Sequence, residues 1–326
     1  MNQTKTVLVV LPLSAAHQAQ LEACAPGAEF IYDSRREPQL EHVRRAQIIL
    51  GNIAKPLLAE ARNLEWLQLE SSGTNHYTDA GILPLGVQLT NATGAFGLGM
   101  AEYMLGMVLS LQKKLPLFRD QQKQHMWRRE GDFLAIHGST TLVVGLGDIG
   151  SEFAQRMHAL GSRVLAIRRT EREKPFYVDE QYNLDALDAL LPQADTVALC
   201  LPSTPQTDHL LNRQRLALLK RTAILVNVGR GAAIDTEALT EALETGQLYG
   251  AALDVTDPEP LPAEHRLWGL ENLIITPHIS GELNIPETWR RLMDIFCHNL
   301  SAYLAGRPLI NEVDFATTYR KADSGF

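Results

Sequence analysis

Short apolar runs alternate with helix-length segments along almost the whole chain, and this alternation constrains the fold more than any other feature. Such an alternation is typical of βαβ units, whose parallel strands are buried on both faces. We therefore predict an α/β protein with two doubly wound parallel sheets. The runs are TVLVVLP (6–12), QIILGN (47–52), LEWLQLESSG (64–73), VQLTNA (87–92), TTLVVGLG (140–147), RVLAIRR (163–169), TVALCLP (196–202), AILVNVG (223–229), AALDV (251–255) and LIITPH (273–278).

The length of the chain favours two domains. It has 326 residues, whereas single cores stop growing near about 250–300 residues. Between the two series of strands, apolar residues of the segment 97–127 recur at helical spacing and include Met100, Met104 and Met107. This face packs either in a core or against a second subunit, and Pro116 is expected to end or kink the helix. A last amphipathic helix is predicted at about 287–305.

Charge and cysteine content exclude several classes of protein. The net charge of −8 argues against a nucleic-acid or anionic-membrane partner, and no run approaches the ~20 apolar residues of a membrane span. The N-terminus is interpreted as a first buried strand, not a signal peptide. The three cysteines form no CxxC motif, so neither a metal site nor a disulfide framework is expected. A reducing cytoplasm is the expected location.

A glycine-rich loop points to a dinucleotide. Gly145, Gly147 and Gly150 stand between a predicted strand and a predicted helix, as GxGxxG requires. The first glycine permits the tight turn, the second lets a pyrophosphate approach, and the third lets helix and strand pack closely. An ordinary glycine-rich turn is the alternative. We predict that a dinucleotide is held by the whole loop, Gly145, Leu146, Gly147, Asp148, Ile149 and Gly150.

The end of the next strand bears on the choice of cofactor. A dinucleotide-binding unit usually has an acid there for the ribose 2′-hydroxyl, but this chain has Arg168, Arg169 and Thr170. A guanidinium pairs with a 2′-phosphate, which a carboxylate would repel. We therefore favour NADP as the cofactor, with NAD possible. The alternative is that these arginines are merely solvated.

Three stretches at predicted strand ends supply an arginine, a carboxylate and a histidine: NVGRGAAID (227–235), ALDVTDPEPLP (252–262) and ITPHISG (275–281). In such sheets the carboxyl ends of the strands carry the site. A cation can anchor a 2-keto acid, and a histidine can give the alcohol oxygen its proton. A carboxylate on the other ring nitrogen would orient the imidazole. The set suits hydride transfer to a 2-keto acid.

The sequence resembles the D-isomer-specific 2-hydroxyacid dehydrogenase family over nearly its whole length. The resemblance implies a Rossmann cofactor domain inserted into a flavodoxin-like substrate domain. We assign 1–98 and 288–326 to the substrate domain and 99–287 to the cofactor domain. Family landmarks occur in the order SSGTNHY (71–77), NATGAFGLGMAEYMLGMVLSL (91–111), VVGLGDIG (143–150), LPSTPQTDHLLN (201–212), NVGRGAAID (227–235), DVTDPEPLP (254–262), TPHISG (276–281) and GRPLINEVDF (306–315).

The resemblance also implies roles for single residues. Arg230 corresponds to the catalytic and substrate-binding arginine, Glu259 to the catalytic glutamate and His278 to the acid/base. Asp257 competes for the glutamate role, but the family has its acid directly before Pro-Leu, which favours Glu259. The backbone N–H groups of Gly73 and Thr74 would bind the substrate carboxylate, since the SSGTN turn resembles the family's carboxylate-holding loop; an ordinary strand-end turn is the alternative.

Further positions are implied around the substrate and the cofactor. His76 is kept as a possible pocket residue, and Asp254 resembles the residue that holds the nicotinamide carboxamide. Gly229 and Thr256 depart from the family's usual alanine and phenylalanine without removing a functional group, so an active enzyme is expected. Other residues implied to line the dinucleotide are Pro202, Thr207, Val228, Gly229, His278, Ser280 and Gly281.

The resemblance favours an NAD(P)-dependent oxidoreductase of small 2-keto acids, similar to glyoxylate/hydroxypyruvate reductases, that yields a D-2-hydroxy acid. The alternatives are a phosphoglycerate dehydrogenase-like enzyme and a dinucleotide-sensing, corepressor-like binding protein. Family members usually dimerise through the cofactor domain, so a homodimer is expected. The complete set of Arg230, Glu259 and His278 favours the enzyme over the binding protein.

Overall fold

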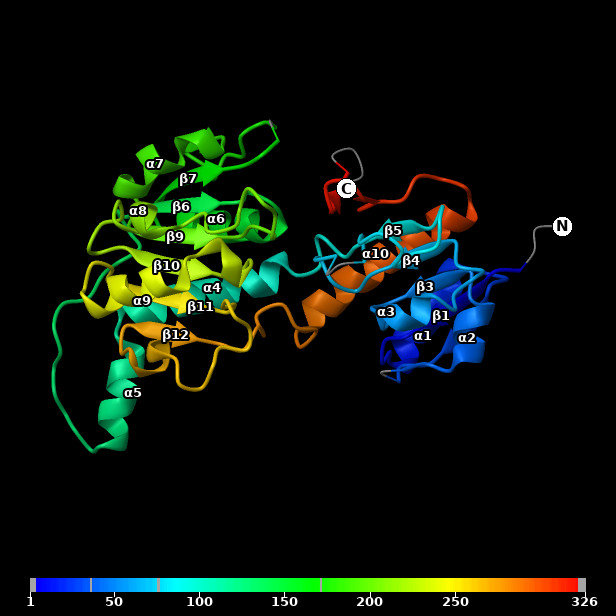
Figure 1. Ribbon diagram of the computed structural model, residues 1–326, viewed down its shortest axis with the longest axis horizontal. Coiled ribbons are helices and arrows are strands. Elements are labelled where there is room, and N and C mark those ends of the chain that lie inside the picture. Colours follow the sequence, from blue (N-terminus) through cyan, green and yellow to red (C-terminus); the bar gives the residue numbers. More distant parts are fainter. Residues whose placement is uncertain (1–3, 36, 75–76, 171, 322–326) are drawn as a thin grey trace. The chain divides into compact units, whose positions relative to one another are not determined.

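The computed structural model describes residues 4–35, 37–74, 77–170 and 172–321 (Figure 1). The chain divides into two compact units. One unit, here called the outer unit because it contains both chain ends, comprises Met1–Phe96 and Leu283–Phe326. The other, the inner unit, comprises Gly97–Glu282. Each is described by itself.

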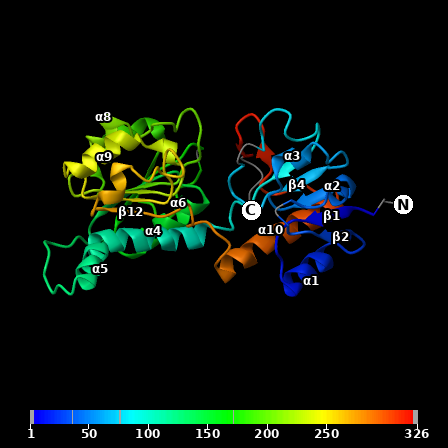
Figure 2. The same cartoon turned by 60° about the horizontal axis from the view of Figure 1, so that its bottom comes forward.

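The outer unit is built on a parallel sheet in the order β2-β1-β3-β4-β5, which is the order of flavodoxin-like sheets. Figure 2 shows α1 and α10 on one face of the sheet and α2 and α3 on the other. The elements are β1 (Thr6–Val9), α1 (Ala15–Cys24), β2 (Glu29–Tyr32), α2 (Leu40–Arg45), β3 (Ile48–Leu50), α3 (Lys55–Leu58), β4 (Trp66–Gln68), β5 (Gln88–Thr90), α10 (Pro286–Leu304), β13 (Val313–Asp314) and β14 (Tyr319–Arg320).

A buried polar network ties α10 to this sheet. The Asn299 amide donates to Gln68 Oε1 (2.8 Å) and to the carbonyl of Ile310 (3.0 Å). Gln68 Oε1 also accepts from the Thr90 hydroxyl, which in turn accepts from the Trp66 indole N–H. Because these buried polar groups satisfy one another, the network stabilises the unit instead of costing desolvation energy. Segments from both ends of the chain therefore share one core.

The inner unit contains a parallel sheet in the order β12-β11-β10-β9-β6-β7-β8. Its reversal between β6 and β9 is the switch point of a dinucleotide-binding fold. Figure 2 shows α4 and α6 on one face and α8 and α9 on the other. The strands are β6 (Thr140–Val144), β7 (Arg163–Ile167), β8 (Glu180–Tyr182), β9 (Thr196–Leu199), β10 (Ile224–Asn227), β11 (Gly250–Leu253) and β12 (Leu273–Ile275).

The helices of the inner unit cover both faces of the sheet, so its central strands β6, β7, β9, β10 and β11 are almost entirely buried, whereas the edge strand β8 is only partly buried. The predicted fold class, two doubly wound parallel sheets, is confirmed. The helices are α4 (Gly97–Gln112), α5 (Leu115–Lys123), α6 (Asp148–Ala159), α7 (Leu187–Leu190), α8 (Arg213–Leu216) and α9 (Thr236–Glu244), with 3-10 turns η1 (Leu184–Ala186), η2 (Leu191–Gln193), η3 (Gly231–Ala233) and η4 (Arg266–Gly269).

The methionine-rich segment forms two helices. Helix α4 ends at Gln112, Lys114 adopts a left-handed conformation (φ 54°), and α5 starts with Pro116 in its first turn. Met100, Met104 and Met107 are all buried within the unit, where α4 packs on α6. The methionine face therefore belongs to the core. Among the described helices, none is both long and apolar enough to cross a membrane.

Candidate active site

Three neighbouring strands of the inner unit end at one edge of the sheet. Asn227 of β10 lies in register with Leu253 of β11, which lies in register with Ile275 of β12. The loops that follow these strands carry Arg230, Glu259 and His278 respectively. Residues from three distant parts of the sequence therefore emerge from adjacent strands at the carboxyl edge, where ligands of such sheets bind.

His278 and Glu259 form a close pair. The Nδ1 atom of His278 lies 2.6 Å from Oε1 of Glu259. The side chains keep 48% and 42% of their exposure, so the pair faces solvent and can meet a ligand. With Nδ1 occupied by the carboxylate, Nε2 is the ring nitrogen left for proton transfer. The pairing predicted from the DPEP and TPH motifs is present, with Glu259 and not Asp257 as the partner.

The backbone of His278 is held in an uncommon conformation. Its φ is +53°, a left-handed value that is uncommon outside glycine, although asparagine, aspartate and histidine adopt it more often than other residues. The N–H of His278 donates to the carbonyl of Asp254 at 2.9 Å. Such conformations persist only where the surroundings enforce them, and they cluster at functional sites.

Asp254 organises the loop that carries His278. Its carboxylate is almost wholly buried, with 1% of the residue exposed. Oδ1 accepts from the Thr276 hydroxyl (2.6 Å) and the N–H of Ile279 (3.0 Å). Oδ2 accepts from the N–H and the hydroxyl of Ser280 (3.0 and 2.5 Å). These four donors fill the acceptor sites of the carboxylate, so Asp254 positions the residues on both sides of His278. Sequence reasoning missed this role.

Arg230 is positioned by the end of β10. The Asn227 side chain donates to the carbonyl of Arg230 (2.9 Å) and accepts from the N–H of Gly229 (3.0 Å). The Arg230 guanidinium donates to the carbonyl of Gly229 (2.7 Å). A Cβ on Gly231 would stand 2.0 Å from the Thr256 carbonyl oxygen. The loop of Arg230 therefore packs against the loop that leads to Glu259, and only glycine permits this approach.

The glycine-rich loop has the geometry that a dinucleotide needs. Gly145 has φ +103°, and a Cβ there would meet the Cys200 carbonyl at 2.6 Å. A Cβ on Gly150 would stand 2.1 Å from the Gly145 carbonyl, so α6 packs closely on the turn. A Cβ on Gly147 would meet nothing within 4 Å, which leaves its backbone open to a ligand. The N-terminus of α6 follows and suits a phosphate.

Asp148 has a contact that the motif did not predict. Its Oδ2 accepts the N–H of Gly97 at 3.0 Å, at the first turn of α4. A carboxylate at a helix N-terminus is favourable, so the side chain of this loop residue helps to join α6 to α4. Leu146 is buried, and Ile149 lies in the first turn of α6.

The predicted cations lie beside this loop. The N–H groups of Gly145 and Leu146 both donate to the carbonyl of Ile167, the last residue of β7, and Arg168 comes next. Burial, reinforced by the charge of Arg172, lowers the pKa of Arg168 from its ordinary value. A partly buried cation in this position gains from an anionic partner. Arg169 and Thr170 are exposed.

The remaining predicted cofactor positions surround the same edge. The Thr207 hydroxyl donates to the carbonyl of Pro202 at 2.7 Å. A Cβ on Gly229 would stand 2.3 Å from the Leu201 carbonyl, so the glycine that replaces the family's alanine sits in a tight contact. Val228 and Ser280 are buried. A Cβ on Gly281 would meet the Met100 sulfur at 3.4 Å.

The predicted carboxylate-binding turn belongs to the outer unit and follows β4. The Ser71 hydroxyl donates to the carbonyl of Gly73 (2.7 Å), and the Thr74 hydroxyl donates to the carbonyl of Thr318 (3.4 Å). His76 lies outside the described residues. Burial raises the pKa of Glu70, which directly precedes the turn, against the opposing effect of the Asn52 N–H. The SSGTN motif, which begins after Glu70, did not point to this acid.

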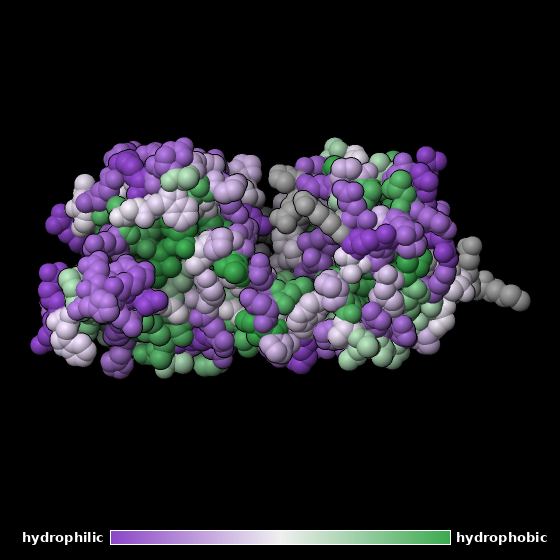
Figure 3. Space-filling model, turned by 90° about the horizontal axis from the view of Figure 1, so that it is seen from below, coloured by the Kyte–Doolittle hydropathy of each residue, from purple (hydrophilic) through white to green (hydrophobic). Residues whose placement is uncertain are grey.

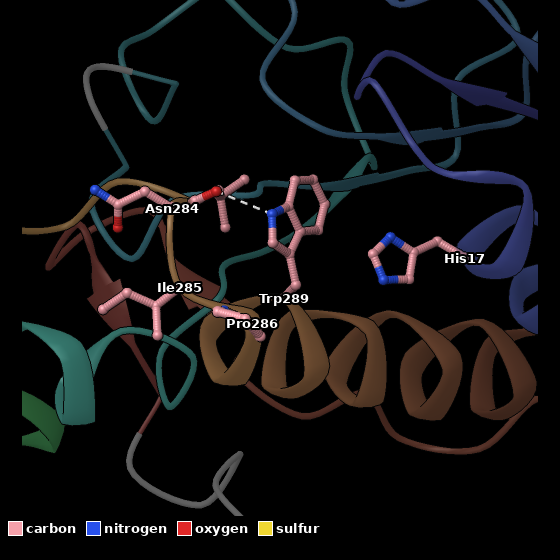
Figure 4. Close-up of a pocket in the computed structure, with 6 residues that line it drawn as sticks. His17, Asn284, Ile285, Pro286 and Trp289 are labelled. Carbon is pink, nitrogen blue, oxygen red and sulfur yellow. Dashed lines mark hydrogen bonds between the residues drawn. The ribbon is translucent and has the colours of Figure 1, made fainter.

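Two other features lie apart from these groups. In the part of the chain that the structure describes, no group of three or more His, Cys, Asp or Glu residues is placed to hold a metal ion. The outer unit has a hollow of about 310 Å³ between α1 and the start of α10 (Figure 4), which contains none of the predicted site residues.

Comparison with known proteins decides the family. The sequence profile of the "D-isomer specific 2-hydroxyacid dehydrogenase, NAD binding domain" matches residues 105–280. A glyoxylate reductase of Thermofilum pendens is 32% identical over 83% of this chain and 82% of its own length. The chain belongs to the D-isomer specific 2-hydroxyacid dehydrogenase family. It is thus an NAD(P)-dependent oxidoreductase of 2-hydroxy acids, which confirms the resemblance found in the sequence.

Solved structures of this family share the whole fold. A family member from Aeromonas salmonicida is 38% identical, with a TM-score of 0.86 over 96% of this chain and all of that one. An NADPH-dependent glyoxylate/hydroxypyruvate reductase of Sinorhizobium meliloti, in complex with NADP and sulfate, is 26% identical. Its TM-score is 0.81 over 97% of this chain and all of that one. A dinucleotide cofactor and a small hydroxy- or keto-acid substrate therefore fit this dehydrogenase.

Proposed function

We propose that this dehydrogenase reduces small 2-keto acids, glyoxylate and hydroxypyruvate first among them, to D-2-hydroxy acids with NADPH. The observation that carries the proposal is the contact of 2.6 Å between His278 and Glu259 at the strand edge that also bears Arg230. The names of the relatives from Thermofilum and Sinorhizobium support the substrate class.

Each polar residue of the set has a part in the reaction. Arg230 binds the substrate carboxylate and polarises the keto group. Nε2 of His278 gives a proton to the oxygen that becomes the alcohol, while Glu259 orients the ring and stabilises its charged form. A bound nicotinamide would supply the hydride. Gly73 and Thr74 hold the substrate carboxylate through their backbone N–H groups, which is the task we assign to the outer unit.

The inner unit binds the cofactor in this proposal. The open backbone of Gly147 and the N-terminus of α6 receive the pyrophosphate. Arg168, with Arg169 and Thr170, receives the 2′-phosphate, which makes NADPH the favoured form. The bound NADP of the Sinorhizobium reductase supports this assignment. Pro202, Thr207 and Val228 line the adenosine and nicotinamide ribose sides, and Ser280 and Gly281 touch the nicotinamide half. Gly229 lies beside Val228, and Asp254 holds the loop of Ser280 through its four accepted hydrogen bonds.

We further propose a homodimer formed through the inner unit. The methionine face is buried, so the contact has to involve other residues. After α5, residues 124–139 form an arm without helices or strands. Large apolar side chains of α5 and this arm are exposed: Leu115 (53%), Met126 (41%), Trp127 (103%) and Phe133 (56%). Figure 3, seen from the side on which α5 lies in Figure 1, shows apolar residues gathered on the surface of this unit. Exposed clusters of large apolar side chains mark interaction sites.

The experiment is a turnover assay. Purified protein is mixed with NADPH or NADH and a panel of 2-keto acids that includes glyoxylate, hydroxypyruvate, pyruvate and phosphohydroxypyruvate, and the loss of reduced cofactor is followed by absorbance. We expect the highest kcat/KM with glyoxylate or hydroxypyruvate and NADPH. A preference for phosphohydroxypyruvate would replace the proposed substrate class. Cofactor binding with no turnover on any acid would favour a dinucleotide-sensing protein.

A cytoplasmic location remains a prediction, compatible with three free cysteines.

A further inference from the structure

Helices α1 and α10 of the outer unit pack side by side (Figure 2). Near their N-termini the rings of His17 and Trp289 stack at 5.2 Å, and Figure 4 shows both side chains at the hollow between the helices. Farther along, the Cys297 thiol lies 3.7 Å from the Gln20 carbonyl, and the Ser301 hydroxyl donates to the Cys24 carbonyl at 2.8 Å. These contacts fix the register in which the two helices meet.

This register brings two cysteines together. Cys24 is the last residue of α1, and Cys297 lies in the middle of α10. The Cys297 thiol contacts the Gln20 carbonyl one turn before Cys24, and the Cys24 carbonyl accepts from Ser301 one turn after Cys297, so the two cysteines lie in facing turns of the helices. Both are free thiols that keep part of their exposure. The third cysteine, Cys200, follows β9 in the inner unit. One pair of adjacent thiols and one separate thiol therefore exist in the same chain.

We propose that Cys24 and Cys297 form an oxidation site, at which a peroxide converts the two thiols into an intramolecular disulfide. In the first step the sulfur of one cysteine attacks a peroxide oxygen, the O–O bond breaks, and a sulfenic acid and water are formed. In the second step the other thiol attacks the sulfenic sulfur, an S–S bond forms, and a second water leaves. The two sulfurs together lose two electrons, and hydrogen peroxide is reduced to two waters.

The surroundings of the two thiols assign the order of attack. Burial, together with the hydrogen bond to Cys24, raises the pKa of Cys297, so little of it is thiolate at neutral pH. The thiolate is the nucleophile in thiol chemistry. The Cys297 thiol also donates to the Gln20 carbonyl at 3.7 Å, a contact that favours the neutral thiol. We therefore assign the first attack on the peroxide to Cys24 and the resolution of the sulfenic acid to Cys297. Burial likewise raises the pKa of Cys200 to about 12, which makes it an internal control.

The expected consequence is a covalent link between the two ends of the chain. A disulfide restricts the unfolded ensemble, and it does so more when the enclosed segment is long. The link from α1 to α10 encloses most of the sequence. The oxidised protein should therefore unfold at a higher temperature than the reduced protein. This inference concerns the outer unit alone and does not rest on the proposed substrate.

The test uses the full chain, treated with a few equivalents of hydrogen peroxide and then alkylated without reductant. We expect an intact mass about 2 Da lower before alkylation, one alkylated cysteine instead of three, and a peptide that links Cys24 to Cys297. Three alkylated cysteines after treatment, or a linked peptide that contains Cys200, would overturn the proposal.

Single variants test the order of attack. Cys297→Ser leaves Cys24 without its resolving partner, so dimedone should trap a sulfenic acid at Cys24. Cys24→Ser should give no adduct at Cys297 under the same conditions. Circular dichroism checks that each variant is folded. Cys200→Ser, which keeps both Cys24 and Cys297, should still form the disulfide. An adduct at Cys297 of the Cys24→Ser variant equal to that at Cys24 would reverse the assigned order.

Discussion

At the scale of single residues, the proposed proton transfer depends on a relay in which Glu259 acts through His278. Glu259 touches Nδ1 of His278, whereas proton transfer is assigned to Nε2. Asp254 holds the backbone around the same histidine with four accepted hydrogen bonds. The motifs predicted the first contact but not the second. Asp254 and Ser280 are 26 positions apart, and no local pattern shows which donors a buried carboxylate will meet.

Replacing Glu259 by glutamine should lower kcat by roughly 10²-fold, because a positioned acid/base pair contributes at least that much. The dissociation constant of NADPH should change little, because Glu259 is not assigned to the cofactor. Steady-state kinetics and a fluorescence titration with NADPH measure the two quantities. Glu259→Asp should restore part of the rate.

The double variant Glu259→Gln/His278→Ala provides the control for this relay. If Glu259 acts through His278, the double variant should be no slower than His278→Ala alone, since residues that work as a unit are not additive. If the double variant instead loses rate by the product of the two single-variant factors, Glu259 acts independently of His278.

Arg168→Asp should shift the ratio of kcat/KM for NADPH over NADH toward NADH by roughly 10- to 100-fold, the worth of one lost charged contact. The physical reason is that an aspartate repels the 2′-phosphate and accepts a hydrogen bond from a 2′-hydroxyl. Arg168→Gln, which removes the charge without adding an acid, should weaken the binding of NADPH and leave the binding of NADH nearly unchanged. A ratio equal to that of the wild type in both variants would remove Arg168 from the cofactor site.

At the scale of elements, the sequence predicted the strands that contain an apolar run and the helices at 97–127 and 287–305, because their patterns are strong. The edge strands β2 (EFIY) and β8 (EQY) were missed, since each is only partly buried and its residues form no long apolar run. The predicted helix at 97–127 is two helices, separated by a left-handed Lys114. The apolar spacing does not show this break, but Pro116, which lies in the first turn of α5, predicted it.

The loop between β2 and α2 gives a prediction on pH and stability. The side chain of Asp33 is 3% exposed and accepts hydrogen bonds from the Arg35 guanidinium (2.6 Å). It also accepts from the N–H of Gln39, the N-cap residue of α2, and lies 2.7 Å from the His42 ring. The Arg35 guanidinium, against the opposing effect of burial, holds the pKa of Asp33 well below its usual range. The carboxylate therefore stabilises the fold above its ordinary pKa of 3.8, and this contribution is lost as the pH falls through the lower, folded-state pKa.

Asp33→Asn should lower the free energy of unfolding at pH 7 by roughly 2–3 kcal/mol, since hydrogen bonds to a charged group are lost. The difference between the wild type and the variant should shrink as the pH is lowered below about 4. Urea unfolding at a series of pH values measures it. A difference that is constant with pH would mean that the charge of Asp33 is unimportant.

At the scale of the whole molecule, the sequence predicted two doubly wound sheets and the family, because the landmark motifs are spread over the chain. It left the methionine face open between a core and a subunit contact. The methionine face suggested by its spacing is core, and the exposed cluster lies on α5 and the arm that follows. The arm is anchored to its own unit by a bond from the N–H of Leu134 to the Gln112 carbonyl and by packing of Phe133 on Phe118.

Trp127→Ser should weaken the proposed homodimer by roughly 30-fold or more, since a buried tryptophan at an interface is often worth about 2 kcal/mol. Light scattering over a range of protein concentrations measures the mass. Leu85→Ser is the matched control, because Leu85 is also fully exposed but belongs to the outer unit. A monomeric wild type, or equal effects of both variants, would contradict the proposed interface.

In the proposed reaction, carbon 2 of a keto acid receives a hydride from NADPH, and its oxygen receives a proton from His278. The most direct measurement uses NADPH deuterated at carbon 4, on the transferring face, with hydroxypyruvate as the acceptor, and analyses the product by mass spectrometry and chiral chromatography. We expect D-glycerate with one deuterium at carbon 2 for each NADPH consumed, and a rate of product formation that is at least roughly 10²-fold lower with His278→Ala. Glycerate of the L form, or D-glycerate without deuterium, would contradict the proposed reaction.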